Sequence, residues 1–465
     1  MFSTKDKVIL SAVFSLGTVV TIFIVLAFNQ VISVASIEDT VARTDFVVDV
    51  AVAADDDIVT TVVATATATP VEAPIVEDIV VETPPYVIVN PYEGVDWDNF
   101  GQFRASLHNH THNSDGSATT ADLVEKLYAM DYDIVAITDH NYLTARWSEV
   151  STGAMTAERE AEILAGTDRD GRPLIPVPFS SEQSRGEHLN TYFAKFNSPR
   201  GAQLEDSIRL SEETGGISVI VHPGRYASAD MSDYQSREAT ANDLDFVQRY
   251  SDIFMQFPSC IGMEIVNRGI DRYFHDRILW DNILAQTMPY NRPVWGFAND
   301  DAHSLEEIGF AFNVLLIDRE DLLTFGLNGL DATTEEELRE QSASNPVRDA
   351  MTNGAFYAVS RVDRAENINS SAVQNRDDLL ALLSQTTPSI STIVVDEQEA
   401  TITISGADYD EIEWIADGIV ISTGNVLDVS ANTAHINSYV RAQLRSSSGI
   451  AFTQPFGIVR ADDSR

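Results

Sequence analysis

The chain has 465 residues, of which 44% are hydrophobic, so it is long enough for two or three domains with a packed core and is not intrinsically disordered. Its formal net charge is −41, from 71 acidic and 30 basic residues, and a field of that sign argues against non-specific nucleic-acid binding. Cys260 is the only cysteine, which excludes an internal disulfide; its place at the start of an apolar run favours a buried side chain over a nucleophile.

Residues 1–35 have the pattern of a membrane anchor or a signal. The segment from Val8 to Phe28 carries no charge and is long enough to cross a bilayer as a helix. Lysines precede it and Glu38 and Asp39 follow it, which favours a cytoplasmic N-terminus and an exported remainder. We therefore expect a membrane-anchored protein at the cell surface or in the periplasm. The alternative is secretion after cleavage near residue 35, where SVAS offers small residues to a signal peptidase.

Residues 36–98 are expected to form an acidic, low-complexity tether. The segment is biased to valine, alanine, threonine, proline and acidic residues, and its prolines and like charges favour an extended chain. Its β-branched runs could also pair as strands, which leaves a short ordered piece as an alternative.

Residues 99–365 alternate helical patterns with short apolar strands. TTADLVEKLYAM, AQLEDSIRLSEETGG and DRILWDNILAQ have helical periodicity, and apolar runs such as DIVAITDHN and GISVIVHPG lie between them. This alternation predicts an α/β fold, either a parallel barrel or an open parallel sheet. In residues 386–465 the helices give way to strands separated by turn residues, which predicts a small, immunoglobulin-like β-sandwich used for support or docking.

Side chains that can bind metal ions stand at the ends of nearly every strand expected in residues 99–365. In ASLHNHTHNSDGS, strand alternation places His108 and His110 on one side, which makes half of a metal site. Because the carboxyl ends of parallel strands face one rim, side chains far apart in the sequence can converge there. The nine candidate ligands are His108, His110, Asp115, His140, Glu182, His188, His222, Asp301 and His303.

The ordered motifs LHNHTHNSDG, AITDHN, SSEQS, VIVHPG and NDDAH resemble those of the PHP (polymerase and histidinol phosphatase) superfamily of metal-dependent phosphoesterases. The resemblance extends from about Phe100 to Arg361. The tail, with EIEWIADG and YVRAQLRSSSGIAFTQPFGI, is similar to the C-terminal module of the carbaryl-hydrolase-like secreted branch. The resemblance implies a distorted seven-stranded (β/α) barrel with a two- or three-metal cluster at its rim.

The resemblance also implies how the ligands are divided among the ions. The first ion would take His108, His110, Glu182 and Asp301. The second would take Asp115, His140 and His303. Glu182 would bridge to a third ion, completed by His188 and His222. An aspartate at position 115 favours a harder ion such as Mn²⁺ or Fe²⁺ over Zn²⁺, although all three metals stay open. His112 is an alternative second-site ligand, but its spacing favours Asp115.

Closely spaced divalent ions would lower the pKa of a bound water toward neutrality, so that a metal-bound hydroxide attacks and no protein nucleophile is required. Asp139 is a catalytic candidate beside His140, although orienting a neighbour or capping a helix is the favoured role. Arg185, Arg225 and Arg268 are candidate substrate-binding clamps at the rim, and Arg225 is also a catalytic candidate. Neutralisation of an acidic neighbour is the alternative for each arginine.

The sequence therefore predicts an exported metal-dependent phosphoesterase that acts on a small phosphorylated substrate. A carbamate or ester hydrolase with the same cluster is one alternative, suggested by the resemblance of the tail. A surface module that binds metal without turnover is the other.

Overall fold

The computed structural model describes residues 86–226, 234–267, 275–361 and 376–460, which all lie in one compact unit, Thr83–Arg465. In these ranges no helix is long and apolar enough to span a membrane. The expected anchor and most of the expected tether lie outside the described residues, so both stay predictions.

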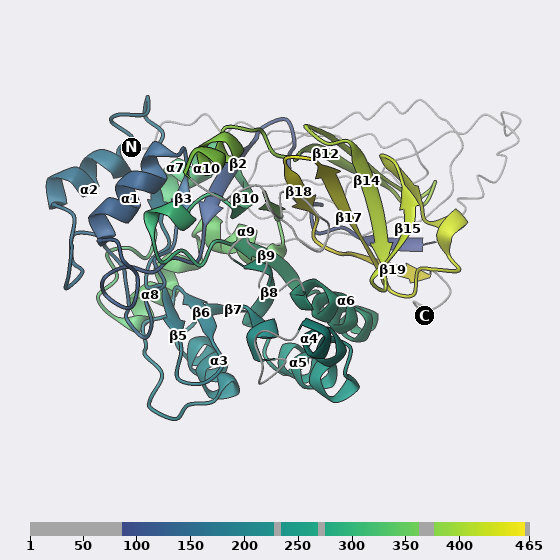
Figure 1. Cartoon of the computed structure of the whole chain (residues 1–465), viewed down its shortest axis with the longest axis horizontal. Coiled ribbons are helices and arrows are strands. Elements are labelled where there is room, and N and C mark those ends of the chain that lie inside the picture. The colour runs from purple at the N-terminus through teal and green to yellow at the C-terminus, as the bar shows by residue number, and fades with distance from the viewer. Residues whose placement is uncertain (1–85, 227–233, 268–274, 362–375, 461–465) are drawn as a thin grey trace, which may run out of the picture. The chain divides into compact units, whose positions relative to one another are not determined.

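The largest sheet has 11 strands and contains strands from both the α/β region and the C-terminal region (Figure 1). Its main path is β1 (Tyr86–Val89), β19 (Phe456–Arg460), β17 (Tyr439–Ser446), β18 (Gly449–Phe452), β11 (Phe356–Ser360), β10 (Ala311–Asp318), β2 (Phe100–Ser106), β3 (Ile134–Val135) and β4 (Ile175–Pro176), and β14 (Glu411–Ala416) and β15 (Ile419–Thr423) attach beside β17. Only β2, β3 and β4 are parallel to one another. The antiparallel pair of β11 and β18 makes the C-terminal strands continuous with the α/β region.

A second sheet of five strands carries the rest of the α/β region. Its order is β5 (Ser181–Gln183), β6 (Leu189–Tyr192), β7 (Ile217–Ile220), β8 (Cys260–Asn267) and β9 (Trp295–Asn299). The strands β7, β8 and β9 are parallel, and β6 is antiparallel to both of its neighbours. Isolated bridges between Asn109 and Ala302, and between His140 and Glu182, connect the two sheets.

The expected closed barrel is not found among the described residues, and the reason is visible at both gaps between the sheets. Beyond β4 the contact with the extension of β6 is irregular: Phe193 N and Ala194 N donate to Pro178 O and Phe179 O at 3.1 and 3.3 Å, whereas Pro176 and Pro178 have no N–H group to donate in return. At β9, the Asn313 amide group accepts from Ala298 N (3.0 Å) and donates to Ala298 O (2.9 Å). Gln454 does the same for Gly296, at 2.8 and 3.0 Å. Side-chain amides therefore replace a neighbouring strand at this edge.

The helices begin and end where capping chemistry allows. Their bounds are α1 (Thr120–Ala129), α2 (Ala157–Leu164), α3 (Leu204–Glu213), α4 (Tyr234–Ala241), α5 (Leu244–Gln256), α6 (His275–Thr287), α7 (Arg319–Phe325), α8 (Glu335–Ser342), α9 (Pro346–Asn353) and α10 (Arg376–Leu383), and the short 3-10 helices are η1 (Pro223–Tyr226), η2 (Met288–Tyr290), η3 (Leu305–Glu307) and η4 (Ser430–Asn432). At α1, the Thr119 side chain accepts from Asp122 N, and Leu123 and Leu127 are buried on one face. The three segments with helical periodicity form α1, α3 and α6.

A third sheet, of β12 (Ser389–Asp396), β13 (Thr401–Ala407) and β16 (Val426–Asp428), completes the C-terminal region. Its buried Ile402 and Ile404 belong to the same apolar cluster as Trp414 of β14 and Leu444 of β17. Two sheets thus share one core here, and Figure 1 shows these strands grouped in green to yellow. The strand β1, from the segment expected to be a tether, pairs with β19.

Candidate metal centre

The first two histidines lie on the buried extension of β2. His110 N donates to Ala302 O at 2.8 Å, so the chain continues in an extended form beyond the end of the strand. His108 and His110 are buried, and their Nε2 atoms are 3.1 Å apart. Asn109 points the other way and donates to Ala136 O. The alternation expected from the sequence therefore aims both imidazoles at one point.

The other candidate ligands come from both sheets. His140 follows β3, Glu182 is on β5, His222 follows β7, and Asp301 and His303 follow β9. His188 precedes β6, so it stands at the start of a strand and not at the end that we expected. It still reaches the same rim, because an antiparallel strand begins where its neighbours end.

The structure brings the nine candidate ligands together. Their ligand atoms form four overlapping groups in which every atom lies within 4.8 Å of the others. The groups are His108, His110 and Asp301; His110, Asp115, His140 and His303; His108, Glu182 and His222; and His140, Glu182 and His188. His112 is not in these groups; its Nε2 lies 2.7 Å from the Ser117 carbonyl oxygen.

Glu182 is the centre of the arrangement. Its Oε2 lies 2.8 Å from His140 Nδ1 and 3.3 Å from His110 Nε2. Its Oε1 lies 2.6 Å from His188 Nδ1 and 3.2 Å from His222 Nε2. Oε2 also lies 3.6 Å from His108 Nε2, so the two oxygens of one buried carboxylate face different sets of imidazoles.

The groups overlap more than the division that the family resemblance implies: His110 joins the group of Asp115, and Glu182 is not in the group of Asp301. Asp301 Oδ1 lies 3.3 Å from His108 Nε2 and 3.0 Å from His110 Nε2, as expected for a first ion. His188 and His222 both lie beside Glu182 Oε1, but they belong to separate groups. None of the four groups therefore contains both histidines, as the third ion of the implied division would require.

Burial and opposite charges compete in setting the pKa values of the centre. Burial alone would lower the pKa of His108, but the carboxylates of Asp301 and Glu264 hold it well above its ordinary value. Burial alone would raise the pKa of Glu182, but His108 and the neighbouring imidazoles hold it well below its usual range. The pKa of Asp301 is lowered in the same way by His108 and His110. Both carboxylates are therefore ionised at neutral pH, the form that binds metal.

Two further observations support the binding of divalent cations by these side chains. Glu182 Oε2 and His140 Nδ1 are buried and close, yet neither makes a hydrogen bond of proper geometry with any described residue. His222 and Asp301 have left-handed backbones, with φ of 34° and 48°. Such conformations cost non-glycine residues on the order of 1–3 kcal/mol and are concentrated at functional sites.

Sequence reasoning missed Glu264, a buried carboxylate on β8. Its Oε1 lies 2.7 Å from His108 Nδ1 and accepts from Asn299 Nδ2 at 2.9 Å. Its Oε2 accepts from His222 N at 2.9 Å and from Asn267 Nδ2 at 2.8 Å. Glu264 thus orients His108 so that Nε2 faces the other ligands. A carboxylate inside the apolar run CIGMEIVN was the available signal.

Asp139 and two of the three candidate arginines are among the described residues. Asp139 is buried and accepts from Thr111 N (2.7 Å) and Ser114 Oγ (2.6 Å), so it holds the loop that follows His110. Arg185 and Arg225 are exposed, each three residues beyond a candidate ligand. Arg268 lies outside the described residues.

No family model and no curated protein matches the chain. Among solved structures, a two-domain protein from Bacteroides vulgatus that contains a predicted PHP-like metal-dependent phosphoesterase is 14% identical, with a TM-score of 0.37, over 79% of this chain and 88% of its own. An amidohydrolase from Chromobacterium violaceum is 16% identical, with a TM-score of 0.27, over 43% and 87%. A protein from Bifidobacterium adolescentis, predicted to be a metal-dependent phosphoesterase, is 15% identical, with a TM-score of 0.26, over 52% and 96%. Because these identities and TM-scores are low, the side chains of the site are the stronger guide to function.

Proposed function

We propose that the chain is an exported, membrane-anchored metal-dependent phosphoesterase of the PHP type, acting on a small phosphorylated substrate. The position of Glu182 carries the proposal. A buried carboxylate with at least two imidazoles at each oxygen suits a bridge between two divalent ions held at a fixed spacing. His108, His110 and Asp301 would complete one site beside it.

Two or three divalent ions in this centre, of zinc, manganese or iron, would supply Lewis acidity and lower the pKa of a water molecule. The described residues leave one side of the centre open to substrate. The Asp115 side chain is 56% exposed, and those of His140 and His303 are 24% and 23% exposed, whereas Glu182 is fully buried. We infer that the phosphoester approaches on the side of Asp115.

Arg185 and Arg225 would supply local positive charge for an anionic substrate. A chain with a net charge of −41 repels an anionic substrate at long range, so nearby cations must bind that substrate. Each arginine is exposed and lies three residues beyond a candidate ligand, Glu182 or His222. Their guanidinium groups can bind two oxygens of one phosphate, which supports a role as clamps.

Export and anchoring follow from the uncharged segment 8–28 with its preceding lysines. We therefore propose that hydrolysis takes place at the cell surface or in the periplasm.

The test is an activity screen of the full chain after chelation and reconstitution with Zn²⁺, Mn²⁺ or Fe²⁺. The substrates are a phosphomonoester, a phosphodiester, an aryl ester and an aryl carbamate. We expect metal-dependent cleavage of a phosphoester that Glu182→Gln abolishes. Glu160→Gln removes another buried carboxylate, one that accepts from Trp147 N, and should retain activity.

Cleavage of only the aryl ester or the carbamate would contradict the phosphoesterase proposal and support the alternative of a carbamate or ester hydrolase. Tight binding of at least two ions without turnover of any of the four substrates would favour a metal-binding module.

A further inference from the structure

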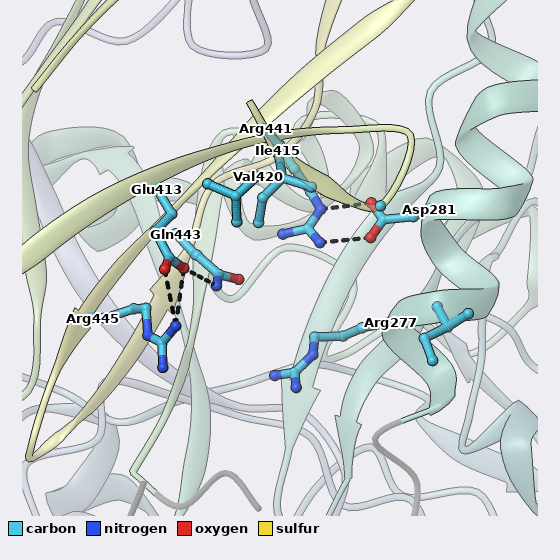
Figure 2. A pocket seen from close by; sticks show the side chains of 10 residues that line it. Arg277, Asp281, Glu413, Ile415, Val420, Arg441, Gln443 and Arg445 are labelled. Carbon is cyan, nitrogen blue, oxygen red and sulfur yellow. Dashed lines mark hydrogen bonds and ion pairs between the residues drawn. The ribbon is translucent and has the colours of Figure 1, made fainter. Parts of the chain in front are cut away.

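A second polar site lies between α6 and the C-terminal strands, away from the nine candidate ligands. It is a cavity of about 280 Å³, close to the roughly 300 Å³ lower end of ligand pockets. Its polar lining consists of Arg277, Asp281, Glu413, Arg441, Gln443 and Arg445, which Figure 2 shows around one space.

The secondary structure explains why these side chains meet. Arg441, Gln443 and Arg445 alternate along β17, so they share one face of the sheet. Glu413 is directly opposite Gln443 in the register of β14 and β17. Arg277 and Asp281 are four residues apart on α6 and lie on one face of that helix. Strand and helix periodicity thus bring one polar face of each element to the same cavity.

Arg441 is the most deeply buried cation of the cavity, with a side chain that is 4% exposed. Its Nε donates to Asp281 Oδ1 at 2.8 Å, and its Nη2 donates to Asp281 Oδ2 at 2.7 Å. Asp281 Oδ1 also accepts from Tyr439 at 3.0 Å. The third nitrogen, Nη1, is buried and has no hydrogen-bond partner among the described residues. In Figure 2 the Asp281 carboxylate lies to one side of this guanidinium group, and the third nitrogen points away from it.

Both oxygens of Glu413, which belongs to the same sheet as Arg441, are already engaged. Glu413 Oε1 accepts from Arg445 Nη1 at 3.0 Å, and Glu413 Oε2 accepts from Gln443 Nε2 at 2.6 Å. Arg277 lines the wall formed by α6. The third nitrogen of Arg441 is a buried N–H donor with no acceptor among the described residues, and such a donor suits an anion with several oxygens.

We propose that this cavity binds a small oxyanion, the phosphate or carboxylate group of a small molecule, at a site separate from the metal centre. Arg441 Nη1 donates to the ligand while Asp281 holds the rest of the guanidinium group in place. Arg277, from α6, supplies a second cation on the other wall. Ile415 and Val420 line the same cavity and offer an apolar surface to the carbon part of an organic anion.

The experiment is calorimetric titration of the full, metal-depleted chain with inorganic phosphate and, separately, with acetate. We expect one binding site for at least one of the two anions, and the anion that binds more tightly assigns the class of ligand. Arg441→Lys keeps a charge for Asp281, but a single ammonium group cannot hold that carboxylate through two bonds and also reach the ligand. It should weaken binding by about tenfold or more, as expected for the loss of one charge-assisted contact.

Arg277→Gln is the second variant, because it leaves the pair of Arg441 and Asp281 intact, and it should weaken binding to a similar degree. Arg209→Gln is the control: this arginine is about half exposed on α3, and its loss should leave binding unchanged. The proposal is overturned if the parent chain binds neither anion, or if both cavity variants bind as the parent does. Neither measurement depends on hydrolysis, so its outcome is independent of the proposed function.

Discussion

Glu264→Gln tests whether the carboxylate on β8 sets the geometry of the metal centre. The substitution keeps the size of the side chain but exchanges one acceptor oxygen for an amide donor. All four partners of Glu264 face it as donors: His108 Nδ1, His222 N, Asn267 Nδ2 and Asn299 Nδ2. Whichever oxygen is replaced, two hydrogen bonds are lost and a donor faces two donors.

The magnitude follows from those contacts. Hydrogen bonds to a charged acceptor contribute about 1.5–3 kcal/mol each, so the loss of two should lower the free energy of unfolding by about 3 kcal/mol or more. Loss of the carboxylate that orients a ligating histidine typically weakens metal binding about 10- to 100-fold. We therefore expect the affinity for the more tightly bound ion to fall within that range.

The assay is competition for metal with a chromophoric chelator, together with a denaturant titration. Glu160→Gln is the matched control, because this buried carboxylate accepts from Trp147 N and Ser148 Oγ and belongs to none of the groups of candidate ligands. The control should lose stability but bind metal as the parent does. Metal affinity that is equal in Glu264→Gln and the parent would refute the orienting role of Glu264.

Elemental analysis should find at least two divalent ions per chain after reconstitution, and less than one would contradict a cluster. Glu182→Ala should cost more activity than His303→Ala in steady-state assays, because Glu182 contacts two pairs of imidazoles; the reverse order would exclude the bridge. Arg225→Gln should raise the KM for phosphorylated substrates by about 10- to 100-fold and leave neutral aryl esters unaffected, whereas equal losses on both would remove the clamp role. Proteolysis within residues 36–82 should release an active unit from membranes, and a loss of activity on cleavage would mean that the tether is required.

The local sequence is enough to identify the residues that could form the centre. Apolar runs that end in histidine, aspartate or glutamate are unusual, because metal-binding groups make poor core material unless they have partners. Helical periodicity is equally local: the buried stripe of α1 can be read from four residues in TADLVEKLYA. These features depend only on neighbours in the chain, so the sequence is sufficient to predict them.

Which strands pair with one another depends on the tertiary structure. The pairing of Tyr86 with Arg460, and of Ser360 with Ile450, depends on which strand edges remain available after the rest has packed. The gap beside β9 depends on the side-chain amides of Asn313 and Gln454, which come from distant parts of the sequence. The role of Glu264 could not be predicted from its apolar run, because His108, the side chain that it orients, lies 156 residues away in the sequence. The periodicity of a helix or strand depends on neighbouring residues, so it could be predicted from the sequence. Strand pairing joins residues that are far apart in the sequence, so it required the fold.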